Sequence, residues 1–218
     1  DSSTGAISFI GNNTYGLTNV VDSHMMKNSE WGAVAYLSHS SYGINTEIRL
    51  NNNGSYITGC GASAEDGSST TECQIAYGGV SDGTYPQSTT GNITGVFDMS
   101  GGAGEYVMGN YGNVTGFSGF TTFPSTKYYD LYSSSQFTGN YTTNMQLCTL
   151  ETCGGHSLYE TAGWYEDIDY FVNSFDTWFI RGGYPYNGSN AGAFYSGYGD
   201  GYADDESGFR SLAIVNGT

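Results

Sequence analysis

The sequence predicts one domain of mixed secondary structure, in which one helix and several short strands carry long irregular loops. Three observations lead to this prediction. An amphipathic pattern occurs between residues 28 and 43, short apolar runs occur elsewhere, and long segments rich in Gly, Ser, Tyr and Asn separate them. The length of 218 residues fits a single domain, residues 1–218, so a second independent domain is not required.

The helix is expected to begin at Asn28 or Ser29, because either side chain can accept the free N–H groups of a first helical turn. Glu30 then lies where a negative charge favours the positive end of the helix dipole. Gly43 is expected to end the helix. The apolar stripe of the helix consists of Trp31, Val34, Ala35 and Leu37.

Short strands are expected at residues 6–10, 47–50, 105–108, 178–181 and 209–215. Unusually long loops lie between them, around residues 51–92, 109–127 and 132–163. The chain has 3 prolines but 20 tyrosines and 11 phenylalanines. These loops are therefore expected to pack against the domain and not to act as linkers.

The charge balance excludes some partners. The chain has 5 basic and 21 acidic residues, which gives a formal net charge of −16. Nucleic acid is not expected as a partner, because phosphate binding takes most of its affinity from Lys and Arg clusters. No apolar stretch reaches the roughly 20 residues that span a bilayer, so no membrane insertion is expected, and any signal or anchor would lie outside this sequence.

The four cysteines form two local pairs, Cys60 with Cys73 and Cys148 with Cys153. Each pair lies in sequence rich in Gly, Ser and Thr, which favours two disulfides in an exported protein. Reduced thiols in a cytosolic chain are one alternative. A zinc site is another, although neither pair has Cys-x-x-Cys spacing and His156 is the only histidine nearby.

A glycine turn between apolar residues occupies residues 91–109. Asp98 and Glu105 lie on either side of it, so the turn can direct two carboxylates and several backbone carbonyls at one point. Oxygen ligands of this kind suit a hard cation such as calcium. The alternative is a turn between strands whose acidic side chains face water.

Residues 92–106 resemble the core motif of the formylglycine-generating-enzyme-like (sulfatase-modifying-factor) family, approximately Asn-x-x-Gly-Leu-Tyr-Asn/Asp-Met-x-Gly-Asn-Val-x-Glu-Trp. Residues 28–33 resemble the helix motif of this family, residues 180–183 its Arg-Gly-Gly strand, and residues 208–210 its closing Gly-Phe-Arg. The four motifs occur in the family's order between residues 22 and 215. The resemblance implies an α+β, C-type-lectin-like domain with short strands, few helices and long loops.

The resemblance also implies a structural calcium ion. The positions that match the family's ligands are the side chains of Asp98 and Glu105 and the backbone carbonyls of Gly101 and Ala103.

The resemblance does not extend to catalysis. Oxidation of a substrate cysteine in this family implies a copper-binding cysteine pair late in the chain, with one cysteine directly after Gly-Phe-Arg. That position is Ser211 here, and no cysteine follows Cys153. A hydroxyl is a poor ligand for a soft metal. His24, His39 and His156 are interpreted as structural residues, and no catalytic residue is assigned.

Residues 184–207 are rich in Tyr, Ser, Gly, Asn and Asp, the residue types that antibody-like loops use for adaptable binding. The segment lies between two framework motifs and resembles the variable region of diversity-generating-retroelement target proteins. The alternative is a loop like the other Gly- and Tyr-rich loops. The expected exposed binding residues are Tyr184, Tyr186, Asn187, Ser189, Asn190, Tyr195, Ser196, Tyr198, Asp200, Tyr202 and Asp204.

These observations predict a non-enzymatic extracellular ligand-binding protein, displayed on a cell surface, pilus or phage. Its partner would be a protein or glycan on another cell or host surface. Cationic patches or polyols are favoured as targets, because Asp200, Asp204, Asp205 and Glu206 make the segment acidic. An oxidoreductase of the formylglycine-generating type and a structural subunit of a filament are the alternatives.

Overall fold

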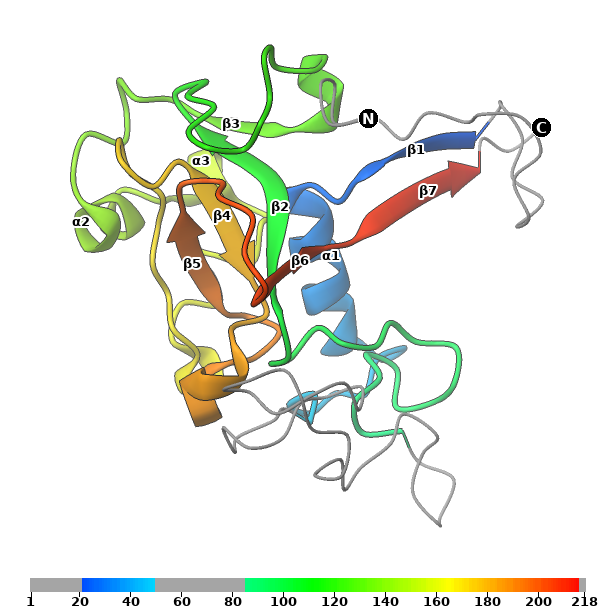
Figure 1. Cartoon of the computed structure of the whole chain (residues 1–218). Coiled ribbons are helices and arrows are strands. Elements are labelled where there is room, and N and C mark those ends of the chain that lie inside the picture. Colours follow the sequence, from blue (N-terminus) through cyan, green and yellow to red (C-terminus); the bar gives the residue numbers. More distant parts are fainter. Residues whose placement is uncertain (1–20, 50–84, 216–218) are drawn as a thin grey trace.

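The computed structural model describes residues 21–49 and 85–215 of the chain (Figure 1). The expected strand at residues 6–10, the Cys60–Cys73 pair and most of the 51–92 loop lie outside the described residues. The strands are β1 (Val21–Met25), β2 (Gly104–Tyr111), β3 (Asp130–Tyr132), β4 (Trp178–Arg181), β5 (Ser196–Gly199), β6 (Ser207–Phe209) and β7 (Ser211–Val215). The helices are α1 (Asn28–Ser38), α2 (Tyr141–Gln146) and α3 (Leu150–Cys153), with 3₁₀ turns η1 (Thr126–Tyr128), η2 (Trp164–Glu166) and η3 (Pro185–Asn190). The α+β class is therefore confirmed.

A five-stranded sheet forms the centre of the fold, with β2 as its hub. Strand β4 pairs antiparallel with β2, and β5 pairs antiparallel with β4. Strands β6 and β3 both pair in parallel with β2, β6 along Gly104–Tyr106 and β3 along residues 109–111. The sheet therefore brings three strands from distant parts of the sequence, β3, β4 and β6, to one strand, β2.

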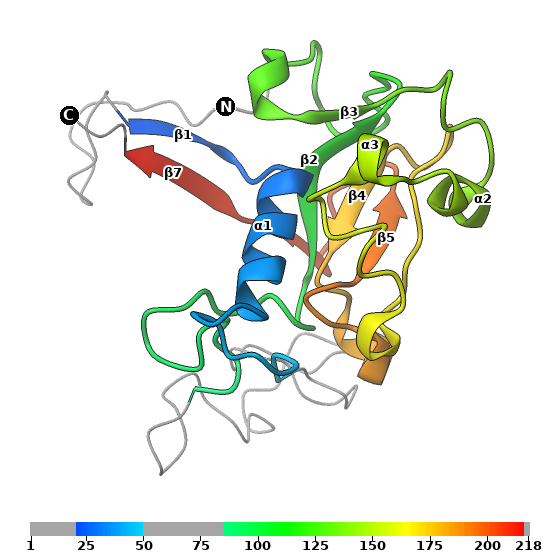
Figure 2. The ribbon, with the colours of Figure 1, turned by 180° about the vertical axis from the view of Figure 1, so that it is seen from behind.

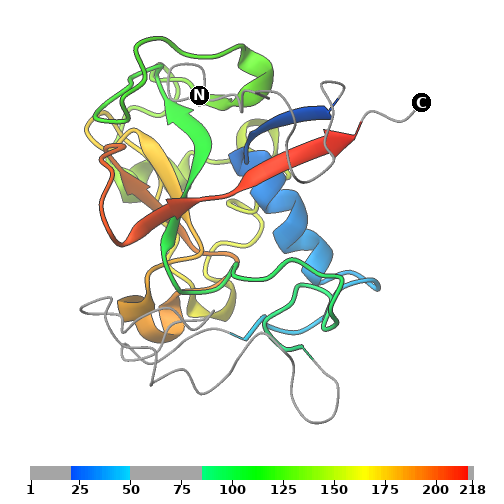
Figure 3. The ribbon, with the colours of Figure 1, turned by 45° about the vertical axis from the view of Figure 1, so that its right-hand side comes forward.

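The two terminal strands of the described chain, β1 and β7, form a separate antiparallel pair. Figure 3 shows this pair projecting from the five-stranded sheet. The single strand expected at residues 209–215 is therefore two strands, β6 and β7. They separate at Arg210, whose carbonyl accepts a hydrogen bond from the Met26 N–H at 2.9 Å.

Helix α1 lies on one face of the sheet (Figure 2). Trp31 and Ala35 are fully buried, and Trp31 Nε1 donates to the Ala193 carbonyl at 2.8 Å. The expectation for Leu37 is wrong: its side chain is 59% exposed, because the buried face of the helix runs through Trp31, Ala35 and Ser38 and leaves Leu37 to one side. The helix ends at Ser38 and therefore stops before Gly43. Residues 47–49 form no strand.

Residues of the expected 132–163 loop reach the core: Tyr132 and Phe137 pack there with Phe171 and with Phe179 of β4. All four are at most 2% exposed, and their rings contact one another at centroid distances from 4.4 to 6.0 Å. The Cys148–Cys153 disulfide is confirmed and lies beside this core, with both cysteines buried. In the part of the chain that the structure describes, no helix is long and apolar enough to cross a membrane.

Candidate functional site

The four motif segments are brought together around β2. In β2 and β4, Glu105 is opposite Arg181, and β6 carries Gly208 next to the same glutamate on the other side. Arg181 extends from the sheet to the start of α1, where its Nη1 donates to Asn28 Oδ1 at 3.3 Å. Residues that are more than 150 positions apart along the chain therefore form one framework.

Arg181 lies at the centre of a buried polar cluster. It is fully buried, its Nη2 donates to the Ser157 carbonyl at 2.9 Å, and burial lowers its pKa to about 10. Asn28 also donates through Nδ2 to Tyr132 Oη at 2.7 Å, and that hydroxyl lies 2.6 Å from His156 Nδ1. Burial lowers the pKa of His156, so it is neutral at pH 7. These contacts give His156 a structural role.

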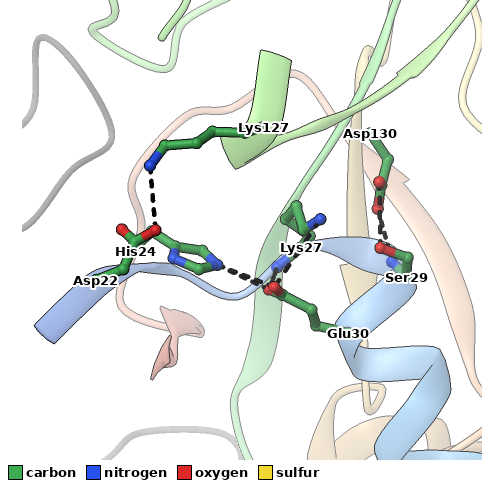
Figure 4. A network of polar contacts seen from close by, with 7 residues as sticks. All are labelled: Asp22, His24, Lys27, Ser29, Glu30, Lys127 and Asp130. Carbon is green, nitrogen blue, oxygen red and sulfur yellow. Dashed lines mark hydrogen bonds and ion pairs between the residues drawn. The ribbon is translucent and has the colours of Figure 1, made fainter. Parts of the chain in front are cut away.

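Figure 4 shows a second polar network at the start of α1. His24 Nε2 lies 3.0 Å from Glu30 Oε1, and Glu30 also accepts the Lys27 N–H at 2.8 Å. The Asp130 carboxylate, from β3, accepts the Ser29 N–H at 2.6 Å and the Ser29 hydroxyl at 3.1 Å. An acid from a distant strand thus caps the helix, where the sequence indicated Asn28 or Ser29.

The turn that was expected to hold calcium adopts a strained, glycine-rich conformation. Asp98, Gly101 and Gly102 have φ values of 63°, 75° and 78°. The Gly101 N–H donates to the Gly182 carbonyl at 2.7 Å, which ties the turn to the end of β4. Among the described residues, no three His, Cys, Asp or Glu side chains gather as a metal-binding group.

The side chain of Arg210, which is far from this turn in the sequence, contacts the turn in the folded protein. Arg210 donates through Nε to Glu105 Oε2 at 2.8 Å and through Nη2 to Glu105 Oε1. It also donates to the carbonyls of Phe97 and Asp98 at 3.1 and 2.7 Å. Burial raises the pKa of Glu105, the nearby charge of Asp98 adds to this, and Arg210 offsets part of it. Arg210 thus engages both oxygens of Glu105, one of the two side chains that the family resemblance implies as calcium ligands.

The structure divides the 184–207 segment into parts with different exposure. Residues 191–197 are buried. Tyr195 and Ser196 are 6% and 1% exposed, so the expectation that they lie on an exposed surface is wrong. The reason is pairing: the Ser196 N–H donates to the Ile168 carbonyl, and its own carbonyl accepts the Tyr170 N–H, both at 2.8 Å. Strand β5 is thus enclosed by β4 and residues 168–170.

The exposed part is the loop of residues 200–206, which we call the acidic loop. Figure 1 shows the chain between β5 and β6 crossing in front of the sheet, on the face opposite α1. Tyr202 is 62% exposed and Asp204 is also exposed. The other expected binding residues are half-buried: Tyr184, Asn187, Asn190, Tyr198 and Asp200. The side chains of Tyr186 and Ser189 are not among those the structure describes.

The acids of the loop affect the pKa of a tyrosine in the strand beneath them. The pKa of Tyr106 in β2 is raised to about 12, mainly by burial, with contributions in the same direction from Tyr184, Asp200 and Asp204. Tyr184 Oη lies 3.4 Å from Ser207 Oγ. The acidic loop therefore lies close over the central strand, with its acidic side chains on the outer surface.

An aromatic cluster that the sequence analysis missed lies beside η3. It consists of His39, Trp164, Tyr165 and Phe194. The His39 ring is 5.7, 5.5 and 5.1 Å from the centroids of Trp164, Tyr165 and Phe194. Trp164 and Tyr165 are 41% and 40% exposed. The signal in the sequence is the run Gly-Trp-Tyr-Glu-Asp at residues 163–167, two adjacent aromatic residues between glycine and acids.

A scan of the chain against protein-family models finds no match, and neither does a search of the curated proteins. The class that the fold defines is an α+β domain. Its finer family assignment remains a proposal, which rests on the four motifs and on the way they meet around β2.

Proposed function

We propose that this protein is a non-enzymatic, extracellular ligand-binding protein with a C-type-lectin-like domain of the formylglycine-generating-enzyme type. Its ligand-binding surface is formed by the exposed residues of the 184–207 segment, chiefly those of the acidic loop. One observation carries the proposal. The 184–207 segment begins and ends in framework strands, yet its acidic loop is exposed above the sheet.

The two ends of the segment are held firmly. At one end, Gly182 and Gly183 have φ values of 79° and 72°. A Cβ on Gly183 would lie 2.6 Å from the Cβ of Ala191, so the close approach at this turn requires glycine. At the other end, Ser207–Phe209 pairs in parallel with β2. A loop held in this way can change its exposed side chains at little cost to the fold.

The acidity of the loop supports a cationic or polyol ligand on another cell or host surface. Asp204, Asp205 and Glu206 are exposed, and so is Tyr202 between them and β5. Tyrosine supplies contact area with few torsions to immobilise, and the carboxylates accept hydrogen bonds from hydroxyl or amine groups.

The proposal is tested by changing exposed side chains alone. A loop variant carrying Tyr202→Ser, Asp204→Ser and Asp205→Ser is compared with a control variant, Tyr42→Ser with Phe175→Ser, which changes two residues that are 85% and 84% exposed. We expect the loop variant to lose binding to a glycan array or to intact cells while its melting temperature is kept. Equal binding by both variants and the unchanged protein would overturn the proposal.

Sequencing the gene from several isolates tests diversification. We expect differences to cluster at the accessible positions 198–206 and to spare residues 191–197, which are buried. Uniform drift across the chain would remove the variable-region interpretation while leaving ligand binding to be measured directly.

The oxidoreductase alternative makes a different prediction. Ser211, directly after Gly-Phe-Arg, is opposite Met25 in the β1–β7 pair. An enzyme of this type would bind copper(I) and consume oxygen in the presence of a thiol peptide. We expect neither activity, and the measurement decides between the two classes.

A further inference from the structure

We propose that the aromatic cluster of His39, Trp164, Tyr165 and Phe194 binds an organic ammonium group. Three of its residues lie outside the 184–207 segment, and Phe194 belongs to the buried part of that segment and not to the acidic loop, so the site does not depend on the function proposed above. In Figure 1, the yellow turn η2 lies beside the orange turn η3 at the lower end of the sheet, and the contacts between the two turns agree.

The backbone of η2 directs two consecutive aromatic rings, those of Trp164 and Tyr165, to the same side of the chain. In an extended chain successive side chains point to opposite faces. Tyr165 and Glu166 instead have φ values of 56° and 66°, a left-handed conformation that is costly for residues other than glycine. As a result, Trp164 and Tyr165 both contact the same ring of Phe194, at centroid distances of 5.2 and 6.2 Å.

Several contacts hold this strained turn in place. The Glu166 N–H donates to the Gly163 carbonyl at 3.2 Å, and Asn190 Nδ2 from η3 donates to the Glu166 carbonyl at 2.7 Å. The Tyr165 hydroxyl lies 2.7 Å from His39 Nε2. Strain that surrounding contacts maintain in this way is typical of binding sites. Here it keeps two large aromatic surfaces exposed to solvent.

One carboxylate, Glu47, supplies negative charge near the rings at pH 7. The pKa of Tyr165 is raised first by burial and then by Glu47 and Asp167, and Asp167, whose own pKa is raised to about 8, is mostly protonated at that pH. Burial raises the pKa of Glu47, with no cation acting in the opposite direction. Burial lowers the pKa of His39, so this ring is neutral at pH 7 and adds no positive charge.

Four of the five cations of the chain are committed elsewhere. Lys27, Lys127 and Arg210 pair with Glu30, Asp22 and Glu105, and Arg181 is fully buried. The fifth, Arg49, makes no ion pair in the described part of the chain and does not act on the pKa of Glu47. An external ammonium group would therefore supply the positive charge that this surface lacks, with cation–π attraction to Trp164 and Tyr165.

The fluorescence of Trp164 reports on binding directly. The chain has three tryptophans, and the other two, Trp31 and Trp178, are 0% and 3% exposed. The full chain is titrated with tetramethylammonium chloride, with sodium chloride at equal ionic strength and tert-butyl alcohol as a neutral probe of similar shape. We expect saturable fluorescence change with tetramethylammonium at millimolar concentrations and none with the other two.

Variants locate the site. We expect Tyr165→Ala to weaken tetramethylammonium binding about three- to fivefold, the loss of one exposed cation–π contact. Glu47→Gln should weaken it by a smaller factor. The matched control, Tyr202→Ala, removes an exposed tyrosine from the acidic loop and should leave the affinity unchanged, which separates this site from the proposed ligand surface.

Three results would overturn the inference. Equal responses to tetramethylammonium and tert-butyl alcohol would mean an apolar patch without charge selectivity. No saturable response to tetramethylammonium would mean no site. An affinity that is unchanged in Tyr165→Ala, in a variant with the melting temperature of the unchanged protein, would place binding elsewhere.

Discussion

Arg210 and Glu105, which are 105 residues apart in the chain, form a two-point contact in which Nε and Nη2 of the arginine donate to the two carboxylate oxygens. The glutamate belongs to the central strand β2, and the arginine lies where the chain leaves β6 for β7. The same guanidinium reaches the carbonyls of Phe97 and Asp98. This one side chain therefore joins the glycine turn, the sheet and the terminal strand pair.

We expect Glu105→Gln to destabilise the domain by about 2 to 3 kcal/mol, because it removes a charged hydrogen-bonding partner from a largely buried arginine. The two side chains are 10% and 20% exposed. A double-mutant cycle with Arg210→Met, measured by urea unfolding, isolates the coupling. The control is Asp22→Asn, which breaks an ion pair with Lys127 that is 29% and 58% exposed and should cost under about 1 kcal/mol. Equal losses in both variants would contradict this ranking.

Calcium at the turn is tested on the unchanged protein and on a paired variant of the two predicted acidic ligands. Because Arg210 engages both Glu105 oxygens and the Asp98 carbonyl, we expect the melting temperature to be equal in EDTA and in millimolar calcium. A rise of several degrees in calcium that disappears in Asp98→Ala with Glu105→Ala would establish the ion implied by the family resemblance. It would also mean that the ion shares Glu105 with Arg210.

The sequence was sufficient where a local pattern determines structure. The stripe with Trp31 and Ala35 predicts α1, and the apolar run at 178–181 predicts β4, because both segments bury their own apolar side chains. Strand β5 has the sequence Ser-Gly-Tyr-Gly and carries no such pattern. It is a strand because β4 supplies its hydrogen-bonding partners.

The candidate sites also show that contacts between distant segments could not be predicted from the sequence. Asp98 and Glu105 could be recognised as neighbours across a turn, but their arginine partner could not, because the Arg210 contact depends on how β6 returns to β2. The aromatic cluster also combines residues from three distant segments. Exposure within residues 184–207 was misjudged for Tyr195, because composition does not show which residues of a Tyr-rich segment form a strand.

The distant cap of α1 makes a stability prediction. Asp130 accepts two hydrogen bonds from Ser29, one from its backbone N–H and one from its hydroxyl (Figure 4). We expect Asp130→Ala to cost about 1 to 2 kcal/mol, the usual effect of removing a helix cap. Urea unfolding measures it, and Asp205→Ala, an exposed acid of the acidic loop, serves as the control with a change under about 0.5 kcal/mol. Identical stabilities for the two variants would contradict the capping role.

The Cys148–Cys153 disulfide closes a short loop, with a sequence separation of 5. Loop-closure entropy for this length gives a stabilisation of roughly 2 kcal/mol. We expect Cys148→Ala with Cys153→Ala to lower the free energy of unfolding by about that amount. Paired substitution is preferable to a reducing agent, because reduction would also act on the disulfide expected between Cys60 and Cys73. A double variant as stable as the unchanged protein would show that the adjoining core holds this segment without the bond.

Asp167 predicts how stability depends on pH. Its pKa is raised to about 8, mainly by burial; Glu47 contributes in the same direction, and the Phe194 N–H, which donates to Oδ2 at 3.1 Å, opposes it. The folded state therefore binds this proton more tightly than the unfolded chain, whose Asp titrates near 3.8. The resulting stabilisation is complete below about pH 4 and is lost as the pH rises through about 8, on the order of 5 to 6 kcal/mol in all.

Asp167→Asn cannot ionise, so its free energy of unfolding should fall less between pH 5 and pH 9 than that of the unchanged protein. Urea unfolding at both pH values gives the two slopes. Asp205→Asn, which alters an exposed acid, controls for the general effect of net charge and should keep the slope of the unchanged protein. The same slope in Asp167→Asn as in that control would mean that Asp167 is ionised at neutral pH in the folded domain. The segment of residues 191–195 packed against it would then have to accommodate a buried charge, and the Phe194 N–H would be one of its few described donors.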